Sequence, residues 1–364
     1  MELRSARVHV GDDLAAMEYF WEQGWTDGLP IVAPTADRVR AFLDRARLEP
    51  DAVIGSYQTR ATALTAEKLA VNAVMAGCKP EYMPVLVAAF EGLTDPAFRM
   101  NHMASLGSPW PLVIVNGPIA KELGMNTGQY VLGPAANRAN ATIGRAVSLC
   151  MANCFGAKVG GVQRGTMGNP NRWSFCIAEN EETPWTPLHV ERGLHPQDSA
   201  VTVVGTMDGV VQFVTPNFSD PVGLCELMAQ RVANGFFTIG TYVVMIAPTF
   251  QQHFLDKGWT KQHIRDYLMK NVRRSVASLK TDGRWERYGT WFAPVPKPLE
   301  PGDETKMVSM VKDESLRQVL WHDAEWARKL DYLIVVCGGE AGNYGAYVGP
   351  YPLGTEPVTK KVKV

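Results

Sequence analysis

The clearest fold signal in the chain is PLVIVNGP, residues 111–118. Pro111 and four aliphatic residues are followed directly by the polar Asn116. A continuous run rich in Val and Ile is typical of a strand buried on both faces. Asn116 and Gly117 then supply a turn, and Pro118 suits the first turn of a helix. Strand–turn–helix is the repeating unit of α/β folds. The sequence therefore predicts an α/β protein with mixed sheets built from such units.

Similar apolar runs recur and predict further strands at residues 31–33, 200–205, 242–246 and 332–336. The turns Pro34-Thr35 and Pro248-Thr249 both separate a predicted strand from a predicted helix. This repetition suggests that the architecture is internally duplicated. Coincidence is an equal alternative, because Pro and Thr are common at such turns.

Apolar periodicity and capping residues predict the helices. Thr35 and Thr65 suit N-caps, while Gly77 and Gly156 suit helix ends. The expected helices span residues 11–23, 65–77 and 139–155, with others starting after Thr35 and at Pro80.

A chain of 364 residues exceeds what one compact core usually carries. We expect an N-terminal α/β half at 1–195 that holds the candidate site, and a C-terminal α/β half at 196–364. We expect residues 281–303 to form a Pro- and Trp-rich arm in the second half. Its aromatic side chains should pack either on the surface of this chain or on a second subunit, and we favour a subunit contact in a homo-oligomer; they are Trp285, Tyr288, Trp291 and Phe292.

Composition excludes several classes of protein. The net charge is −1 and 20% of the residues are charged. The chain therefore lacks the excess of basic residues that is typical of a nucleic-acid or membrane-surface binder. No apolar stretch resembles a signal peptide or a bilayer-spanning helix, and six scattered cysteines predict reduced thiols. We therefore expect a cytoplasmic protein. The basic run at 360–363 is expected to be a frayed tail.

The densest polar stretch runs from Cys176 to Arg192. If residues 189–191 are extended, His189 and Glu191 share one face, as an acid–base pair or two metal ligands would. Glu181 is a further candidate partner of the imidazole. The alternative is an acidic surface loop whose charge Arg192 offsets.

Asn140, Thr142 and Arg145 lie at the start of the predicted helix 139–155. Its N-terminal amides and the Arg145 guanidinium could hold a substrate carboxylate. The alternative is helix capping with the arginine in solvent. Gly339 and Gly342 follow a predicted strand, so we expect them to line the pocket with Asn116, although their spacing is not that of a nucleotide-binding loop.

Cysteines offer one alternative. Cys150 and Cys154 are spaced i,i+4 on one helix face, and Cys176 is near in sequence, which permits a soft-metal site. Buried free thiols are the commoner outcome.

Six blocks of the sequence carry a family resemblance: GWTDGLP at 24–30, VNAVMAGC at 71–78, VNGP at 115–118, ANATIGR at 139–145, AENEE at 178–182 and LHVERG at 188–193. Together they resemble a poorly characterised bacterial family whose members are linked with small proteins bearing a selenocysteine- or cysteine-Gly-Ser-Cys (UGSC) motif. The resemblance implies a metabolic role coupled to thiol or selenol redox chemistry, with a thiol or selenol protein as partner. This chain lacks the Gly-Ser-Cys motif.

The leading hypothesis is an enzyme of lyase or hydrolase type that acts on a small carboxylate-bearing molecule. His189 would serve as acid or base with Glu181 or Glu191, and we predict no cofactor, with a metal as the open alternative. One alternative is a metal-dependent enzyme using His189, Glu191 and Cys176. Another is a non-catalytic subunit of a thiol or selenol redox system.

Overall fold

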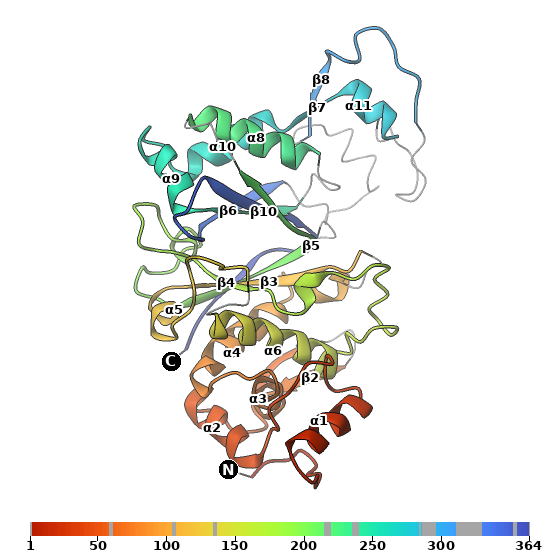
Figure 1. Cartoon of the computed structure of the whole chain (residues 1–364), viewed down its shortest axis with the longest axis vertical. Coiled ribbons are helices and arrows are strands. Elements are labelled where there is room, and N and C mark those ends of the chain that lie inside the picture. Colours follow the sequence, from red (N-terminus) through yellow and green to blue (C-terminus); the bar gives the residue numbers. More distant parts are fainter. Residues whose placement is uncertain are drawn as a thin grey trace. The chain divides into compact units, whose positions relative to one another are not determined.

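The computed structural model confirms the α/β class (Figure 1). Contacts divide the chain into two units. Unit 1 comprises Met1–Gly209, Val335–Glu340 and Thr355–Val364, and unit 2 comprises Val210–Ile334 and Ala341–Gly354. The first boundary thus lies at 209/210 rather than at 195, and the C-terminal residues return to unit 1. The structure describes residues 2–57, 61–103, 107–133, 137–214, 220–234, 240–283, 285, 296–310, 330–351 and 355–363.

Unit 1 begins with helices and a hairpin and then builds a sheet. Its predicted helices form close to their expected bounds, because Asp12 and Thr65 cap two of them through side-chain hydrogen bonds and Gly156 ends a third in a left-handed conformation. The elements are α1 (Asp13–Glu22), α2 (Ala36–Ala46), β1 (Val53–Tyr57), β2 (Thr62–Thr65), α3 (Ala66–Met75), α4 (Met83–Leu93), β3 (Trp110–Asn116), α5 (Pro118–Glu122), α6 (Arg138–Phe155), β4 (Cys176–Ala178), α7 (Leu188–Glu191), the first ten residues of β5 (Ala200–Val214) and β11 (Val358–Lys361).

Strand β3 occupies the centre of the unit 1 sheet, and all seven of its residues are buried. It pairs in parallel with β4 and antiparallel with β5, and β11 pairs antiparallel with β5. The sheet is therefore mixed, as predicted. Helices α2, α3, α4 and α6 pack against one another, and Phe90 of α4 stacks on Phe155 of α6 (Figure 1).

Two expectations for unit 1 are wrong. Residues 31–33 form no strand; the backbone N–H of Val32 instead donates to the carbonyl of Met75, so the first half of the suggested duplication is missing. The basic tail is not frayed, because residues up to Lys361 form β11. Lys360 and Lys361 also pair with Asp95 and Asp198.

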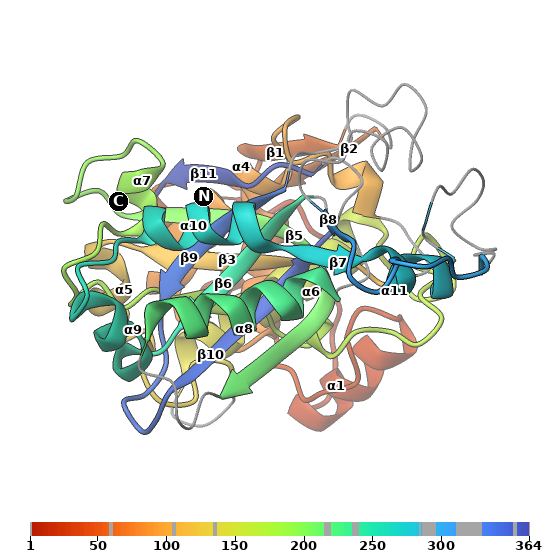
Figure 2. The same ribbon diagram turned by 90° about the horizontal axis from the view of Figure 1, so that it is seen from above.

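Unit 2 carries a second set of strands. Strand β6 pairs antiparallel with β10, and β9 lies on the other side of β6. Figures 1 and 2 show α8 and α10 side by side over these strands. The elements are α8 (Pro221–Ala233), β6 (Thr241–Ile246), α9 (Pro248–Leu255), α10 (Lys261–Asn271), β7 (Arg273–Ser275), α11 (Val276–Thr281), β8 (Met307–Ser309), β9 (Asp331–Val336, ending in unit 1) and β10 (Tyr344–Pro350).

The predicted arm is described only in part. Trp285 lies near Lys306, whose ammonium is 6.0 Å from the indole centroid. The other aromatic residues of the predicted subunit contact lie outside the described residues; they are Tyr288, Trp291 and Phe292.

Within the described ranges, no helix combines the length and apolar character needed to cross a bilayer.

Candidate functional site

A cavity of about 590 Å³ lies in unit 1 near the N-terminus of the chain. This volume is in the range of small-molecule sites, about 300–1,000 Å³. Helix α1 contributes Ala16, Tyr19 and Phe20, and the loop after it contributes Trp25. The opposite lining comes from α2, α3 and the end of α6, including Val39, Val71, Met75, Asn72 and Cys154. The cavity therefore has aromatic and aliphatic walls with a few polar groups.

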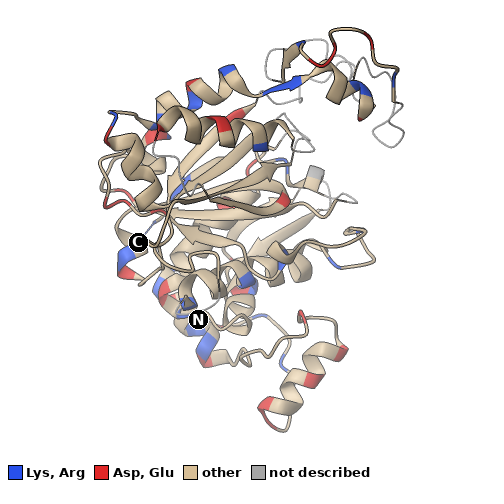
Figure 3. Cartoon of the chain, turned by 45° about the horizontal axis from the view of Figure 1, so that its top comes forward, with Lys and Arg blue, Asp and Glu red and all other residues tan. Residues whose placement is uncertain are grey.

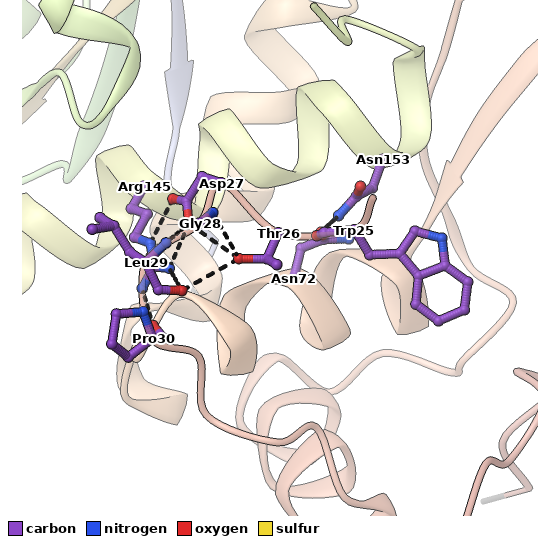
Figure 4. A network of polar contacts seen from close by, with 9 residues as sticks. All are labelled: Trp25, Thr26, Asp27, Gly28, Leu29, Pro30, Asn72, Arg145 and Asn153. Carbon is purple, nitrogen blue, oxygen red and sulfur yellow. Dashed lines mark hydrogen bonds and ion pairs between the residues drawn. The ribbon is translucent and has the colours of Figure 1, made fainter. Parts of the chain in front are cut away.

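The loop after α1 is fixed to α6 by an ion pair (Figure 4). Arg145 Nε and Nη2 each donate to the carboxylate of Asp27 at 2.8 Å, and the same guanidinium reaches the carbonyls of Leu29 and Pro30. Burial opposes ionisation of Asp27, but the hydrogen bond and charge of Arg145 outweigh it and lower the pKa of that carboxyl. The ion pair thereby holds one wall of the cavity in place.

A chain of amides connects the same loop to the cavity (Figure 4). Asn153 Nδ2 donates to the carbonyl of Trp25 and to Oδ1 of Asn72, both at 2.8 Å. Asn72 is buried and donates in turn to the Sγ of Cys154 at 3.6 Å. Sequence positions 25, 72 and 153–154 thus meet at the cavity.

Cys154 differs from the other five cysteines. It is half-buried, whereas the others are buried. A hydrogen bond from the Cys150 thiol lowers the pKa of Cys154; burial opposes this shift, and the charge of Lys68 and the amide of Asn72 reinforce it. Burial raises the pKa of Cys150 well above its ordinary value. The pair therefore favours a thiolate on Cys154 and a thiol on Cys150.

The charged side chains around the cavity are mostly cationic. Arg7, Lys68 and Lys158 line it, and Glu67 is the one carboxylate among the lining residues, all of which are described. Both oxygens of Glu67 accept backbone N–H groups, from Arg4 and Ser5. Figure 3 marks acidic positions on α1, but none of these residues lines the cavity. The cavity therefore suits an anion.

The predicted acid–base residues meet elsewhere in unit 1. Asn116, at the end of β3, donates from Nδ2 to Glu179 at 2.7 Å and to Glu181 at 2.8 Å. The backbone N–H of Gly117 also donates to Glu181, and that of Leu188 donates to Glu179. Parallel pairing of β3 with β4 brings these groups together, because both strands end at the same edge. Glu179 was not among the predicted site residues.

His189 completes this buried cluster. Its Nδ1 lies 3.5 Å from Glu181 Oε1, and its side chain is 0% exposed. Within the described part of the chain, neither ring nitrogen has a hydrogen-bond partner, nor does Asn116 Oδ1. Buried polar atoms without partners are costly, so this group retains capacity for a water molecule or a polar ligand.

The expected pairing of His189 with Glu191 is wrong. Residues 188–191 form the short helix α7 instead of an extended segment, so side chains two positions apart point to different sides. His189 is buried and Glu191 is exposed. Glu181, the other predicted partner, is the carboxylate beside the imidazole.

The residues of α6 that were predicted to bind an anion form hydrogen bonds with other residues of the chain. Asn140 is buried and exchanges two hydrogen bonds with the backbone of Asn126, while Thr142 donates to the carbonyl of Arg138. Arg145 holds a carboxylate, but it is that of Asp27. The hydrogen-bonding groups predicted to bind a substrate instead shape unit 1.

The glycines after β9 divide between the two units. Gly339 lies in unit 1 against Gln129, and the N–H of its neighbour Gly338 donates to the carbonyl of Thr127. Cys337 precedes them; burial and the nearby charge of Glu179 raise its pKa to about 12. Gly342 belongs to unit 2, where its positive φ of 114° serves the turn before β10.

The alternative metal set is not assembled. Cys176 lies buried in β4, and Glu191 is exposed on α7. Within the described ranges, no three His, Cys, Asp or Glu side chains are grouped as a metal site would require.

Sequence reasoning noted the Cys150–Cys154 spacing but missed the cavity. The cavity depends on how residues 3–36 fold against α3 and α6, and no local motif encodes that packing. No family model, curated protein or solved structure matches this chain.

Proposed function

We propose that this chain is an enzyme acting on a small carboxylate-bearing molecule that binds in the cavity of unit 1. The supporting observation is the composition of the cavity lining. Three cationic residues line a space with apolar walls, and one of them, Lys158, also donates to the carbonyl of Gly24; the single carboxylate of the lining, Glu67, is already held by backbone amides.

The two kinds of lining suggest how such a molecule lies. Its apolar body packs against Tyr19, Phe20 and Trp25, where burial contributes about 25 cal/mol per Å² of apolar surface. Its carboxylate pairs with Lys68, Lys158 or Arg7. A pair of unit charges at 4 Å contributes about 1 kcal/mol in water and about 4 kcal/mol near a protein surface. The charge therefore selects the anion, and the apolar walls supply most of the affinity.

Ligand-dependent thermal stability tests this proposal. We expect benzoate, phenylacetate and hexanoate to raise the Tm, and the uncharged amides of the same acids to raise it less. A free ligand concentration of 100 times the Kd stabilises the folded protein by about 2.7 kcal/mol. Lys68→Gln should weaken the carboxylate effect, whereas Lys79→Gln, a lysine outside the cavity lining, should not. Equal shifts with acids and amides would contradict the proposal.

A second candidate function is acid–base catalysis of lyase or hydrolase type at Glu181 and His189. One observation favours it: a buried imidazole lies beside a carboxylate, and neither of its nitrogens has a hydrogen-bond partner among the described residues. Glu181 is partly exposed, so a small polar molecule could approach from its side.

We also propose a cytoplasmic bacterial protein that forms a homo-oligomer. All six cysteines are free, which fits a reducing compartment. Exposed apolar side chains concentrate between residues 8 and 32, which supports self-association. A thiol or selenol redox protein remains the partner that the family resemblance implies. The exposed residues are Val8, Val10, Leu14, Trp21, Trp25, Leu29 and Val32.

A further inference from the structure

Cys154 combines three properties that rarely occur together in a packing cysteine. It lines a cavity large enough for a small molecule, it is half-buried rather than buried, and polar groups surround its sulfur. The amide of Asn72 donates to that sulfur at 3.6 Å, and Lys68 lies close enough for its charge to act on it. A thiol that only filled space would need neither contact.

The electrostatics of Cys150 and Cys154 favour ionisation of Cys154. Cys150 donates its S–H to Cys154, and Lys68 adds a positive charge, so the pKa of Cys154 is lowered. Burial raises the pKa of four other cysteines: Cys78, Cys176, Cys225 and Cys337. Because the thiolate is the nucleophilic form, reactivity at neutral pH should concentrate on Cys154.

We infer that Cys154 is a nucleophile that reacts with carboxylate-bearing molecules held in the cavity. This inference rests on the proposed function and adds the atom that attacks. In the simplest case the substrate carries an electrophilic carbon with a leaving group. The thiolate sulfur forms a bond to that carbon, the bond to the leaving group breaks, and the leaving group departs with the electron pair. No proton moves in this step, because the attacking form is the thiolate.

The neighbouring groups take distinct roles in this step. Lys68 attracts the carboxylate and stabilises the thiolate. Asn72 is a positioning residue, since Asn153 holds its Oδ1 while its Nδ2 donates to the carbonyl of Lys68 at 2.9 Å and to the sulfur at 3.6 Å. Cys150 remains a buried thiol and donates its hydrogen bond throughout.

Alkylation with a matched pair of reagents tests the inference. Iodoacetate carries a carboxylate and iodoacetamide is its uncharged counterpart; both displace iodide from the same carbon. We expect peptide mass spectrometry of the full chain to find the first adduct at Cys154 with either reagent. The ratio of the iodoacetate rate to the iodoacetamide rate should be about tenfold higher at Cys154 than for glutathione, which corresponds to about 1.4 kcal/mol of charge attraction.

Three variants separate the causes. Cys154→Ser should remove the early adduct and leave the slow adducts unchanged. Lys68→Gln should return the rate ratio towards that of glutathione and shift the pH midpoint of alkylation upwards, and Lys79→Gln should do neither. Asn72→Ala should slow both reagents equally, because it acts on the sulfur and not on the carboxylate.

Two results would overturn the inference. One is alkylation of Cys154 no faster than that of the buried cysteines in the native protein. The other is a rate ratio equal to that of glutathione. Neither result would by itself remove the proposed function, because the Tm shifts with benzoate and benzamide report binding without the thiol. Cys154→Ser should keep those shifts.

Discussion

Arg145 holds the carboxylate of Asp27 with two hydrogen bonds of 2.8 Å across 118 residues of sequence. Both side chains are largely buried, with 14% and 19% exposure. The pair joins α6 to the loop that carries Trp25, so it couples the long helix to a wall of the cavity.

Arg145→Lys should loosen this loop. Lysine keeps the charge but cannot form two parallel hydrogen bonds with one carboxylate. Hydrogen bonds to charged groups contribute about 1.5–3 kcal/mol each, and lysine retains part of that. We expect a loss of about 1–3 kcal/mol in the free energy of unfolding, measured by urea denaturation, and a smaller Tm shift with benzoate. Arg40→Lys is the control, since the ion pair of Arg40 in the described part of the chain is with the exposed Asp37.

Asp27 should also make stability depend on pH. Its pKa in the folded chain lies below the ordinary value of 3.8, so the folded state favours the ionised form. This contribution is fully present above the unfolded pKa and is lost as pH falls through the folded one. Asp27→Asn should be less stable than the parent at pH 7, and the difference should shrink on acidification below about pH 4. A constant difference from pH 7 to pH 2 would exclude this explanation.

The buried cluster predicts unequal effects for two carboxylates near one histidine. Glu181→Gln removes the charge beside His189, whereas Glu191→Gln changes an exposed position on α7. If acid–base catalysis occurs there, Glu181→Gln should reduce turnover about 10²–10⁴-fold and Glu191→Gln should leave it unchanged. His189→Asn should match Glu181→Gln. Full activity in both Glu181→Gln and His189→Asn would leave the cluster a structural role only.

Local sequence signals predicted the elements better than the site. Continuous apolar runs marked β3, β6 and β9, since burial on both faces leaves few alternatives. The strand β11 was missed because Lys360 and Lys361 hid its pairing with β5, which only the tertiary fold provides. The parallel pairing of β3 and β4 put Asn116 beside Glu181, which no spacing in sequence encodes.

The C-terminal strand should be essential to unit 1. Deleting residues 358–364 removes the pairing of β11 with β5 and the ion pair of Lys360 with Asp95. It also exposes an edge of β5, which favours aggregation. We expect a Tm lower by several degrees and a shift to larger species in size-exclusion chromatography. Lys363→Gln is the control, because it keeps β11 and removes an ion pair between the exposed Lys363 and the partly buried Glu91. An unchanged Tm on deletion would show that the tail is dispensable.

Alanine substitutions at two glycines can separate the cost of a steric clash from the cost of backbone strain. Gly117 and Gly124 both have positive φ, 84° and 62°. A Cβ on Gly117 would lie 2.2 Å from the carbonyl oxygen of Asp198, whereas one on Gly124 would meet nothing within 4 Å. Gly124→Ala should therefore cost about 1–2 kcal/mol, the conformational penalty alone.

Gly117→Ala should cost clearly more, because the backbone must also move away from Asp198. That movement would displace the N–H of Gly117 from Glu181, to which it donates at 2.7 Å. Denaturant unfolding of the two variants measures the difference in stability. Equal losses would mean that the turn at Gly117 can shift without cost.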